Sequence, residues 1–263
     1  MQEQNDILIA LLADAGFESF EDTDTHLLAY IPEKDFSEDR LREIPFCQRG
    51  AAEITLIPEQ NWNAVWESNY PPVLIANRCY IYAPFHEKRP EIEFNILVRP
   101  KMAFGTAHHE TTAQMIELML EQDFTDKTVL DMGCGTGVLA ILASLKGARH
   151  IDAVDNDNWS YENTEENRKA NHRTNITTVL GDASFLEDKP ATYDIVLANI
   201  NKNILLNDMP AYAKALKTGG KIFFSGFYNN DLDDIKTKAA SLRLQYQNHH
   251  TQNNWVAAVF TKK

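Results

Sequence analysis

The feature that most constrains the fold is the stretch at residues 129–137, which reads Val-Leu-Asp-Met-Gly-Cys-Gly-Thr-Gly. An apolar strand ends there in a carboxylate and enters a turn with glycines at 133, 135 and 137, which opens a predicted helix. Glycine has no Cβ, so such a turn can adopt positive φ and let the backbone approach a ligand closely. Val138 stands where the dinucleotide pattern G-x-G-x-x-G needs its third glycine, and no Lys-Ser/Thr pair follows. Neither a pyrophosphate site nor a phosphate-binding P-loop is therefore predicted.

From residue 101 to the end, apolar runs alternate with helical patterns, which is typical of an α/β sheet with crossover helices. Strands are predicted at 128–132, 151–155, 176–180, 195–199 and 221–225, and helices at 136–146, 158–171, 202–216 and 230–240. No helical stretch separates the last two apolar runs, 242–248 and 255–261, so they predict an antiparallel hairpin at the sheet edge. The expected fold of residues 101–263 is a Rossmann-like, seven-stranded α/β domain.

The chain before this domain divides into two further regions. Residues 1–58 predict a small α+β domain in the order α-β-β-α-β, with Gly16 ending the first helix, Ser37 capping the second, and a last strand at 52–57. Residues 59–100 are expected to form a connector and the start of the catalytic domain. They carry Trp62 and Trp66 on one helix turn, which are expected to pack between domains, and then two apolar runs at 73–85 and 92–98 that can pair as strands.

Charge is distributed unevenly along the chain. The sequence has 25 Lys and Arg against 38 Asp and Glu, for a net charge of −13, and residues 1–70 hold 15 of those acids with only 4 bases. A strongly acidic protein is a poor non-specific binder of nucleic acid, because that affinity depends on cationic contacts to phosphate. The acidic first quarter is either a solvated face or a docking module for a basic partner, and charge alone does not separate the two.

Several features favour a cytoplasmic protein. No apolar run approaches the ~18–20 residues of a membrane span, and the apolar stretch 7–12 is short and has no basic residues before it, unlike a signal peptide. Cys47, Cys79 and Cys134 share no CxxC spacing, which argues against a structural zinc site or a disulfide scaffold and suits a reducing compartment. No metal site is predicted.

The D-x-G-x-G-x-G pattern resembles motif I of class I methyltransferases that use S-adenosylmethionine (SAM). Asp155 ends the next predicted strand, where an acid can accept both ribose hydroxyls of an adenosine, and Asp182 follows the third strand, where a side chain can reach the adenine amino group. Strand ends also hold Asp and Gly for backbone reasons. The glycine turn and the two acids follow three successive predicted strands, and together they nevertheless predict SAM as the cofactor.

The fourth predicted strand ends in Ala198-Asn199-Ile200-Asn201. Amino-group methyltransferases hold the nucleophilic nitrogen with an Asn or Asp here and with adjacent backbone carbonyls. The N-P-P-Y pattern of adenine and glutamine methyltransferases is absent, which weighs against a planar base or amide and is compatible with an aliphatic amine. The alternative is that Asn199 only caps the following helix.

Residues 103–112 read Ala-Phe-Gly-Thr-Ala-His-His-Glu-Thr-Thr. Together with motif I and Leu-Ala-Asn-Ile at 197–200, this stretch closely resembles the AFGTG-x-H-x-TT pattern of the ribosomal protein L11 methyltransferase (PrmA) family. Ala107 stands where that family usually has glycine. The family's small N-terminal domain resembles a ferredoxin-like fold that begins with a strand, whereas this sequence opens on its first helix, so we expect that strand to be missing from the small domain.

The resemblance implies a set of site residues. Its cofactor contacts fall on Thr112, Gly133, Asp155 and Asn199, with Gly135 and Asp182 beside them, and with Phe104, Gly105 and Thr106 in the wall over the cofactor. For catalysis we expect Asn199 and the carbonyl of Ile200 to orient the amine while water takes its proton.

The implied activity is methylation of lysine ε-amines and of the N-terminal α-amine of ribosomal protein L11. The acidic charge and the lack of a long apolar run predict no binding of nucleic acid or membranes. One docking arm with one catalytic domain is compatible with a monomer. Two alternatives remain open at this point. One is another SAM-dependent N-methyltransferase that acts on a different protein or a small amine, and the other is a SAM-binding module without catalysis.

Overall fold

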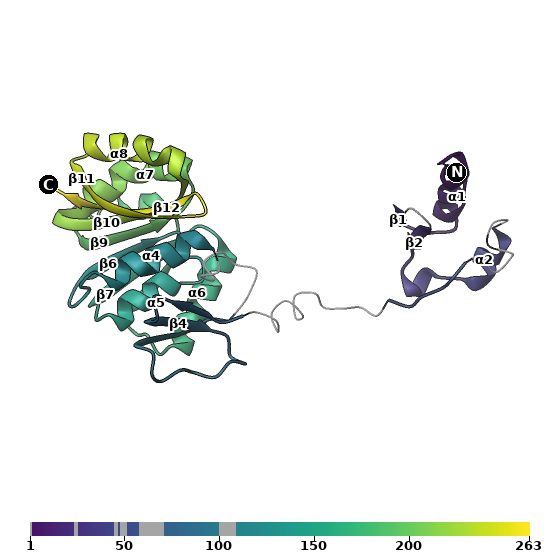
Figure 1. Cartoon of the computed structure of the whole chain (residues 1–263), viewed down its shortest axis with the longest axis horizontal. Coiled ribbons are helices and arrows are strands. Elements are labelled where there is room, and N and C mark those ends of the chain that lie inside the picture. Colours follow the sequence, from purple (N-terminus) through teal and green to yellow (C-terminus); the bar gives the residue numbers. More distant parts are fainter. Residues whose placement is uncertain (1, 24–25, 45–46, 48–51, 58–70, 100–108) are drawn as a thin grey trace. The chain divides into compact units, whose positions relative to one another are not determined.

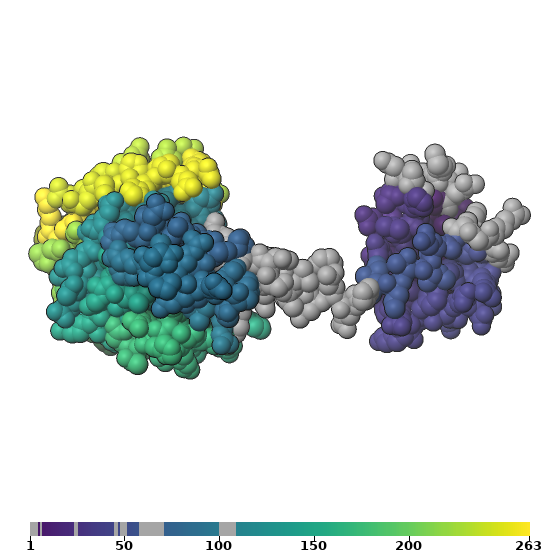
Figure 2. All heavy atoms as spheres, turned by 60° about the horizontal axis from the view of Figure 1, so that its bottom comes forward, coloured from purple at the N-terminus to yellow at the C-terminus, as the bar shows by residue number. Residues whose placement is uncertain are grey.

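The computed structural model describes residues 2–23, 26–44, 47, 52–57, 71–99 and 109–263. The chain divides into two compact units, Met1–Asn61 and Trp62–Lys263, whose elements are drawn in Figure 1 and whose atoms are drawn in Figure 2.

A seven-stranded sheet forms the frame of the second unit, and its strand order is β11-β12-β10-β9-β6-β7-β8. Neighbouring strands from β10 to β8 are parallel, and β12 is antiparallel to both β10 and β11. The strand bounds are β6 (Thr128–Met132), β7 (His150–Asp155), β8 (Ile176–Leu180), β9 (Tyr193–Asn199), β10 (Leu216–Tyr228), β11 (Leu244–Gln252) and β12 (Trp255–Lys262). The predicted seven-stranded sheet and its C-terminal edge hairpin are confirmed.

The direction of the crossovers assigns the helices to the two faces of this sheet. The chain moves outward from β6 through β7 to β8 and then returns to β9, so right-handed connections place α5 (Val138–Leu145) and α6 (Asn158–Ala170) opposite α7 (Lys202–Ala215). The return from β8 to β9 makes the carboxyl ends of β6 and β9 a topological switch point, where ligands of open α/β sheets bind.

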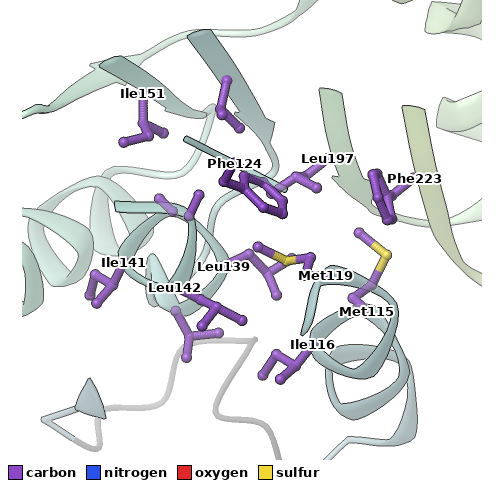
Figure 3. Close-up of a cluster of buried hydrophobic side chains, with 14 of the residues drawn as sticks. Met115, Ile116, Met119, Phe124, Leu139, Ile141, Leu142, Ile151, Leu197 and Phe223 are labelled. Atoms are coloured by element: carbon purple, nitrogen blue, oxygen red, sulfur yellow. The ribbon is translucent and has the colours of Figure 1, made fainter. Parts of the chain in front are cut away.

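Each face has its own apolar core. The first cluster joins α4 (Glu110–Leu120) and α5 to sheet residues, and Figure 3 shows Met115 and Met119 of α4 beside Leu197 and Phe223 of the sheet. The second cluster joins α7 and α8 (Leu232–Ser241) to the opposite side chains of the same strands. Short 3-10 turns, η2 (Ala183–Leu186) and η3 (Asn229–Asp231), follow β8 and precede α8.

A small three-stranded sheet adds a layer over the first core. Strands β3 (Val73–Ile75) and β4 (Cys79–Tyr82) form a hairpin, and β5 (Phe94–Leu97) pairs parallel to β4. Side chains of Ile75, Ile81 and Ile96 are buried with those of α4 and α5. The two apolar runs predicted between residues 73 and 98 therefore do form paired strands, and the first of them is split by a turn.

The first unit contains α1 (Gln2–Asp14), the antiparallel hairpin β1 (Ser19–Asp22) and β2 (Leu27–Tyr30), η1 (Glu33–Asp35) and α2 (Glu38–Glu43). As predicted, Gly16 follows the first helix with φ of +100°, and Ser37 caps α2 by accepting from the N–H of Arg40. Leu12, Leu41 and Ile44 form its small core.

The strand predicted at residues 52–57 is wrong, because the structure gives this segment no strand. Its Ile54, Leu56 and Ile57 are more than half exposed. Apolar composition favours extended backbone, but a strand also needs a neighbour that supplies its hydrogen bonds. Among the residues described in the first unit, only β1 and β2 pair.

Candidate active site

The loop after β6 adopts the conformation that its glycines predict. Gly133, Gly135 and Gly137 have φ of +73°, +54° and +76°, in the left-handed region that favours glycine. The loop also lies very close to the end of β9, since a Cβ built on Gly133 would be 2.3 Å from Cγ2 of Ile200. A side chain at position 133 would therefore push apart the two segments that meet at the switch point.

Asp155, at the tip of β7, is tied to this loop. Its Oδ2 accepts from the backbone N–H of Gly135 at 2.9 Å, and its Oδ1 accepts from the backbone N–H of Asp157 at 3.0 Å. Each carboxylate oxygen has a second lone pair, so Asp155 retains capacity to accept from hydroxyl groups. The structure thus brings together Asp155 and Gly135, two of the predicted cofactor residues.

A second pair of predicted site residues meets across the sheet edge. Nδ2 of Asn199 donates to Oγ1 of Thr112 at 3.2 Å, although the two residues are 87 positions apart in the chain. The N-cap of α7 is Asn201, whose side chain accepts from the N–H of Ile204. Asn199 is therefore not the helix cap, and the structural alternative considered for it is wrong.

The backbone of Ile200 is held from two sides. Its N–H donates to the carbonyl of Ser225 at 3.2 Å. Gly226 has φ of +90°, and a Cβ built on it would lie 2.3 Å from the carbonyl oxygen of Ile200. Glycine is required at position 226 for this contact, which fixes the peptide group that follows Asn199.

Asp182 follows β8 and caps η2 by accepting from the N–H of Ser184 at 2.9 Å. Donation from the side chain and backbone of Ser184 lowers the pKa of Asp182, so the group is a carboxylate at neutral pH. Phe104, Gly105 and Thr106, as well as Ala107, Trp62 and Trp66, lie outside the described residues.

The comparisons with known proteins decide the family. The model of the ribosomal protein L11 methyltransferase (PrmA) family matches residues 4–263. The chain belongs to this family.

Relatives named ribosomal protein L11 methyltransferase occur in several bacteria. The chain is 44% identical to the protein of Phocaeicola vulgatus over 98% of its own length and 94% of that relative's. It is 35% identical to the protein of Chlorobaculum parvum, with coverage of 98% and 92%. A crystal structure of the ribosomal protein L11 methylase from Lactobacillus delbrueckii subsp. bulgaricus superposes with a TM-score of 0.67 at 27% identity, covering 74% of this chain and all of that one. The predicted family and fold class are confirmed.

PrmA family membership makes SAM the cofactor, and Asp131, the acid of the glycine-rich motif, supports the fit although no cofactor contact was predicted for it. This β6 carboxyl is buried, and its Oδ2 accepts from the N–H of Ala140 at 3.0 Å. Its Oδ1 is buried with no hydrogen-bond partner in the part of the chain that the structure describes. Burial raises the pKa of Asp131 to about 7. An unpaired carboxylate oxygen suits a cationic donor such as the amino group of SAM.

An aromatic cluster in this PrmA family member was also not predicted. The ring of Trp255 lies 4.1 Å from that of Tyr228 and 4.8 Å from that of His109, centroid to centroid. His109 caps α4, the helix that carries Thr112, and Tyr228 ends β10, in which Ser225 pairs with Asn199. No sequence motif links these three residues, since three separate elements supply them.

Among the residues that the structure describes, no group of three or more His, Cys, Asp or Glu side chains is arranged to hold a metal ion. Nor is any helix in the described ranges long and apolar enough to cross a membrane.

Proposed function

We propose that this protein transfers methyl groups from SAM to amino groups of ribosomal protein L11, both lysine ε-amines and the N-terminal α-amine, in the cytoplasm. The observation that carries the proposal is the Asn199–Thr112 hydrogen bond beside the glycine loop, in a chain 44% identical to a ribosomal protein L11 methyltransferase. We take the substrate from the relative's name, and we place the amine beside Asn199 from the geometry of the site.

The cofactor would be held by residues at the carboxyl ends of three strands, β6, β7 and β8. Gly133 and Gly135 offer close backbone approach, Asp155 offers acceptors for ribose hydroxyls, and Asp131 offers an anionic partner for an amino group. Asp182 lies next along the sheet edge, after β8. When bound, SAM supplies an electrophilic methyl group on a sulfonium centre.

Asn199 and Ile200 would orient the amine. Because Nδ2 of Asn199 donates to Thr112, the amide presents its carbonyl oxygen as the group that accepts from an amine N–H. The carbonyl of Ile200 is a second acceptor of fixed position, held against Gly226. Two acceptors direct the nitrogen lone pair away from them, and this orientation is the main contribution that a protein makes to an in-line displacement.

The amine must lose a proton before it attacks. A lysine with a pKa of ~10.4 is only about 0.04% neutral at pH 7, which corresponds to about 4–5 kcal/mol. Desolvation and a nearby positive sulfonium both favour the neutral amine. Within the described ranges no carboxylate or imidazole bonds to Asn199, so water takes the proton in this mechanism.

The first unit is proposed to dock the substrate. Residues 1–61 hold 14 Asp and Glu against 4 Lys and Arg, and ribosomal proteins are commonly basic. Complementary charge chiefly accelerates encounter and selects partners. Raising salt should therefore raise the KM for L11 while leaving SAM affinity nearly unchanged. If the KM for L11 did not change with salt, the proposed docking role of the first unit would be wrong.

The experiment that tests the activity is intact-protein mass spectrometry of purified L11 after incubation with this protein and SAM. Additions in steps of one methylene mass establish the reaction, and proteolytic mapping locates the modified amines. Asn199→Ala should abolish most of the turnover, while Asn201→Ala, which changes only the cap of α7, should retain it. No mass change, with SAM binding shown separately, would point to a different substrate. Full activity of Asn199→Ala would overturn the catalytic assignment.

A further inference from the structure

Helix α6 buries a row of polar side chains. All of its buried residues are polar, namely Ser160, Asn163, Thr164 and Asn167. Burying an amide costs free energy unless its donors and acceptors are paired. Thr164 and Asn167 of this row bond to groups outside the helix, and these partners show which segments α6 positions.

The first set of partners is the cofactor loop. Oγ1 of Thr164 donates to the carbonyl of Gly135 at 2.8 Å, and Nδ2 of Asn167 donates to the carbonyl of Thr136 at 2.9 Å. Two consecutive loop carbonyls therefore point toward α6. Because the peptide group is planar and trans, the N–H of Thr136 points away from α6. The helix thereby sets the orientation of the loop's peptide groups.

The second set of partners is the backbone that leaves β5. Oδ1 of Asn167 accepts from the N–H of Arg99 at 2.9 Å. One turn further on, Asn171 accepts from the N–H of Leu97 at 2.9 Å and donates to its carbonyl at 2.6 Å. In the sequence, Arg99 comes just before residues 103–112, which carry the family pattern.

Asn167 joins the two sets. Its side chain is fully buried, and its Nδ2 also donates to Oδ1 of Asn163 at 2.7 Å, so both amide hydrogens and the oxygen are in use. We propose that Asn167 is a positioning residue for methyl transfer, which holds the cofactor loop at Thr136 and the backbone at Arg99 with a single amide. The inference rests on the proposed function only in taking the loop as the SAM site.

The side-chain chemistry explains why the residue is asparagine. Aspartate would keep an acceptor for Arg99 but could not donate to Thr136 or Asn163 at neutral pH. Leucine would have a similar volume and would leave the Arg99 N–H and the Thr136 carbonyl without this partner. Glutamine would place the same amide one methylene too far from the helix.

Asn171 provides a matched control. It is the C-cap residue of the same helix and makes a comparable set of bonds to the backbone, but its partners are Leu97 and the carbonyl of Asn167 and not the cofactor loop. A general weakening of α6 would affect Asn171→Ala and Asn167→Ala alike. A loss specific to the loop would appear only at Asn167.

The test compares Asn167→Asp, Asn167→Ala and Asn171→Ala in the full chain. Isothermal titration with SAM should show a Kd raised at least tenfold for both Asn167 variants and less than threefold for Asn171→Ala. In the absence of SAM, amide hydrogen exchange at residues 133–137 should be faster in the Asn167 variants only. The nearly isosteric Asp variant keeps the test valid if the Ala variant does not fold.

Two outcomes would overturn the inference. One is a folded Asn167→Asp variant with wild-type SAM affinity and wild-type exchange in the loop, and the other is equal weakening by Asn171→Ala. If the wild-type chain itself did not bind SAM, the proposed function would fail, and the exchange measurement would still decide whether Asn167 orders the loop.

Discussion

Helices α5 and α6 adjoin the same glycine loop, but different forces hold them in place. α5 begins at Val138, directly after the loop, and buries seven of its eight residues, six of them apolar. α6 buries four residues, all polar, and two of them hydrogen-bond to loop carbonyls. Apolar burial is non-directional and supplies stability, whereas a hydrogen bond to a named backbone group fixes position. The stability of this unit and the shape of its cofactor loop should therefore respond to different substitutions.

The largest expected effect is on stability and comes from α5. Leu142 is fully buried in the first core, as Figure 3 shows. Leu142→Ala should lower the free energy of unfolding by about 2–5 kcal/mol, through lost burial and the cavity left behind. Urea unfolding measures this, and SAM affinity below the transition should stay within about threefold of wild type. The volume-conserving Leu142→Met serves as control and should cost less than about 1.5 kcal/mol. A large loss of SAM affinity in a folded Leu142→Ala variant would contradict the view that α5 supplies stability while α6 positions the loop.

A smaller change in stability with a larger change in binding is expected from α6. Thr164→Val keeps the shape of the side chain and leaves the carbonyl of Gly135 without its donor, at a cost of about 1–3 kcal/mol. SAM titration should show weaker binding, because the peptide groups of the loop are no longer held. Thr164→Ser retains the hydroxyl and should bind SAM more tightly than Thr164→Val does. The reverse order would show that the methyl group of Thr164, and not its hydrogen bond, matters.

Substitution of Asp131, just before the same loop, changes a buried charge at nearly constant shape. Burial raises the pKa of its carboxyl from 3.8 to about 7, so the folded state binds more protons than the unfolded chain between those values. Stability contributed by this group therefore falls as pH rises from about 4 to about 7. Asp131→Asn should gain stability relative to wild type over that range and should bind SAM less tightly at pH 8. Denaturant midpoints of both proteins across pH 5–8 measure the difference, and a constant difference would rule out this titration.

The smallest effect is expected at Glu165, which does not belong to the row of buried polar side chains on α6. Glu165 pairs with Arg168 and Lys169 on the same helix, and its hydrogen bond to Arg168 lowers the pKa of Glu165 to about 2. This pair stabilises the fold above the ordinary pKa of glutamate and is lost as pH falls toward 2. Glu165→Gln should cost less than about 1 kcal/mol at pH 7 and less still at pH 3, with unchanged SAM binding. A change in SAM binding would extend the positioning role on α6 to Glu165.

Much of the fold was predictable because periodicity and loop chemistry agree in the second unit. Apolar strands alternate with helices there, and an acid or an amide follows the carboxyl end of a strand at Asp155, Asp182 and Asn199. Residues 52–57 show the limit of this reasoning, since an apolar run predicts a strand only if a neighbour pairs with it.

The site was predictable where motifs are local, and not where partners come from distant elements. The sequence left open that Asn199 caps the following helix, and only the geometry assigns the cap of α7 to Asn201. The polar composition of α6 is typical of a solvated helix, yet Asn163 and Asn167 are fully buried. Asn167 bonds to the backbone of Thr136 and Arg99, and Asn163 accepts from Asn167. No sequence pattern reveals such backbone partners.

The peptide of Ile200 has an evolutionary consequence. Its side chain meets Gly133 and its carbonyl meets Gly226, so three positions from three strand ends share one small volume. A side chain at position 226 would meet the backbone of Ile200, which no substitution at 200 removes, whereas a side chain at position 133 would meet only the side chain of Ile200. In a lineage of such enzymes, position 226 should therefore stay glycine, and position 133 should change only together with position 200.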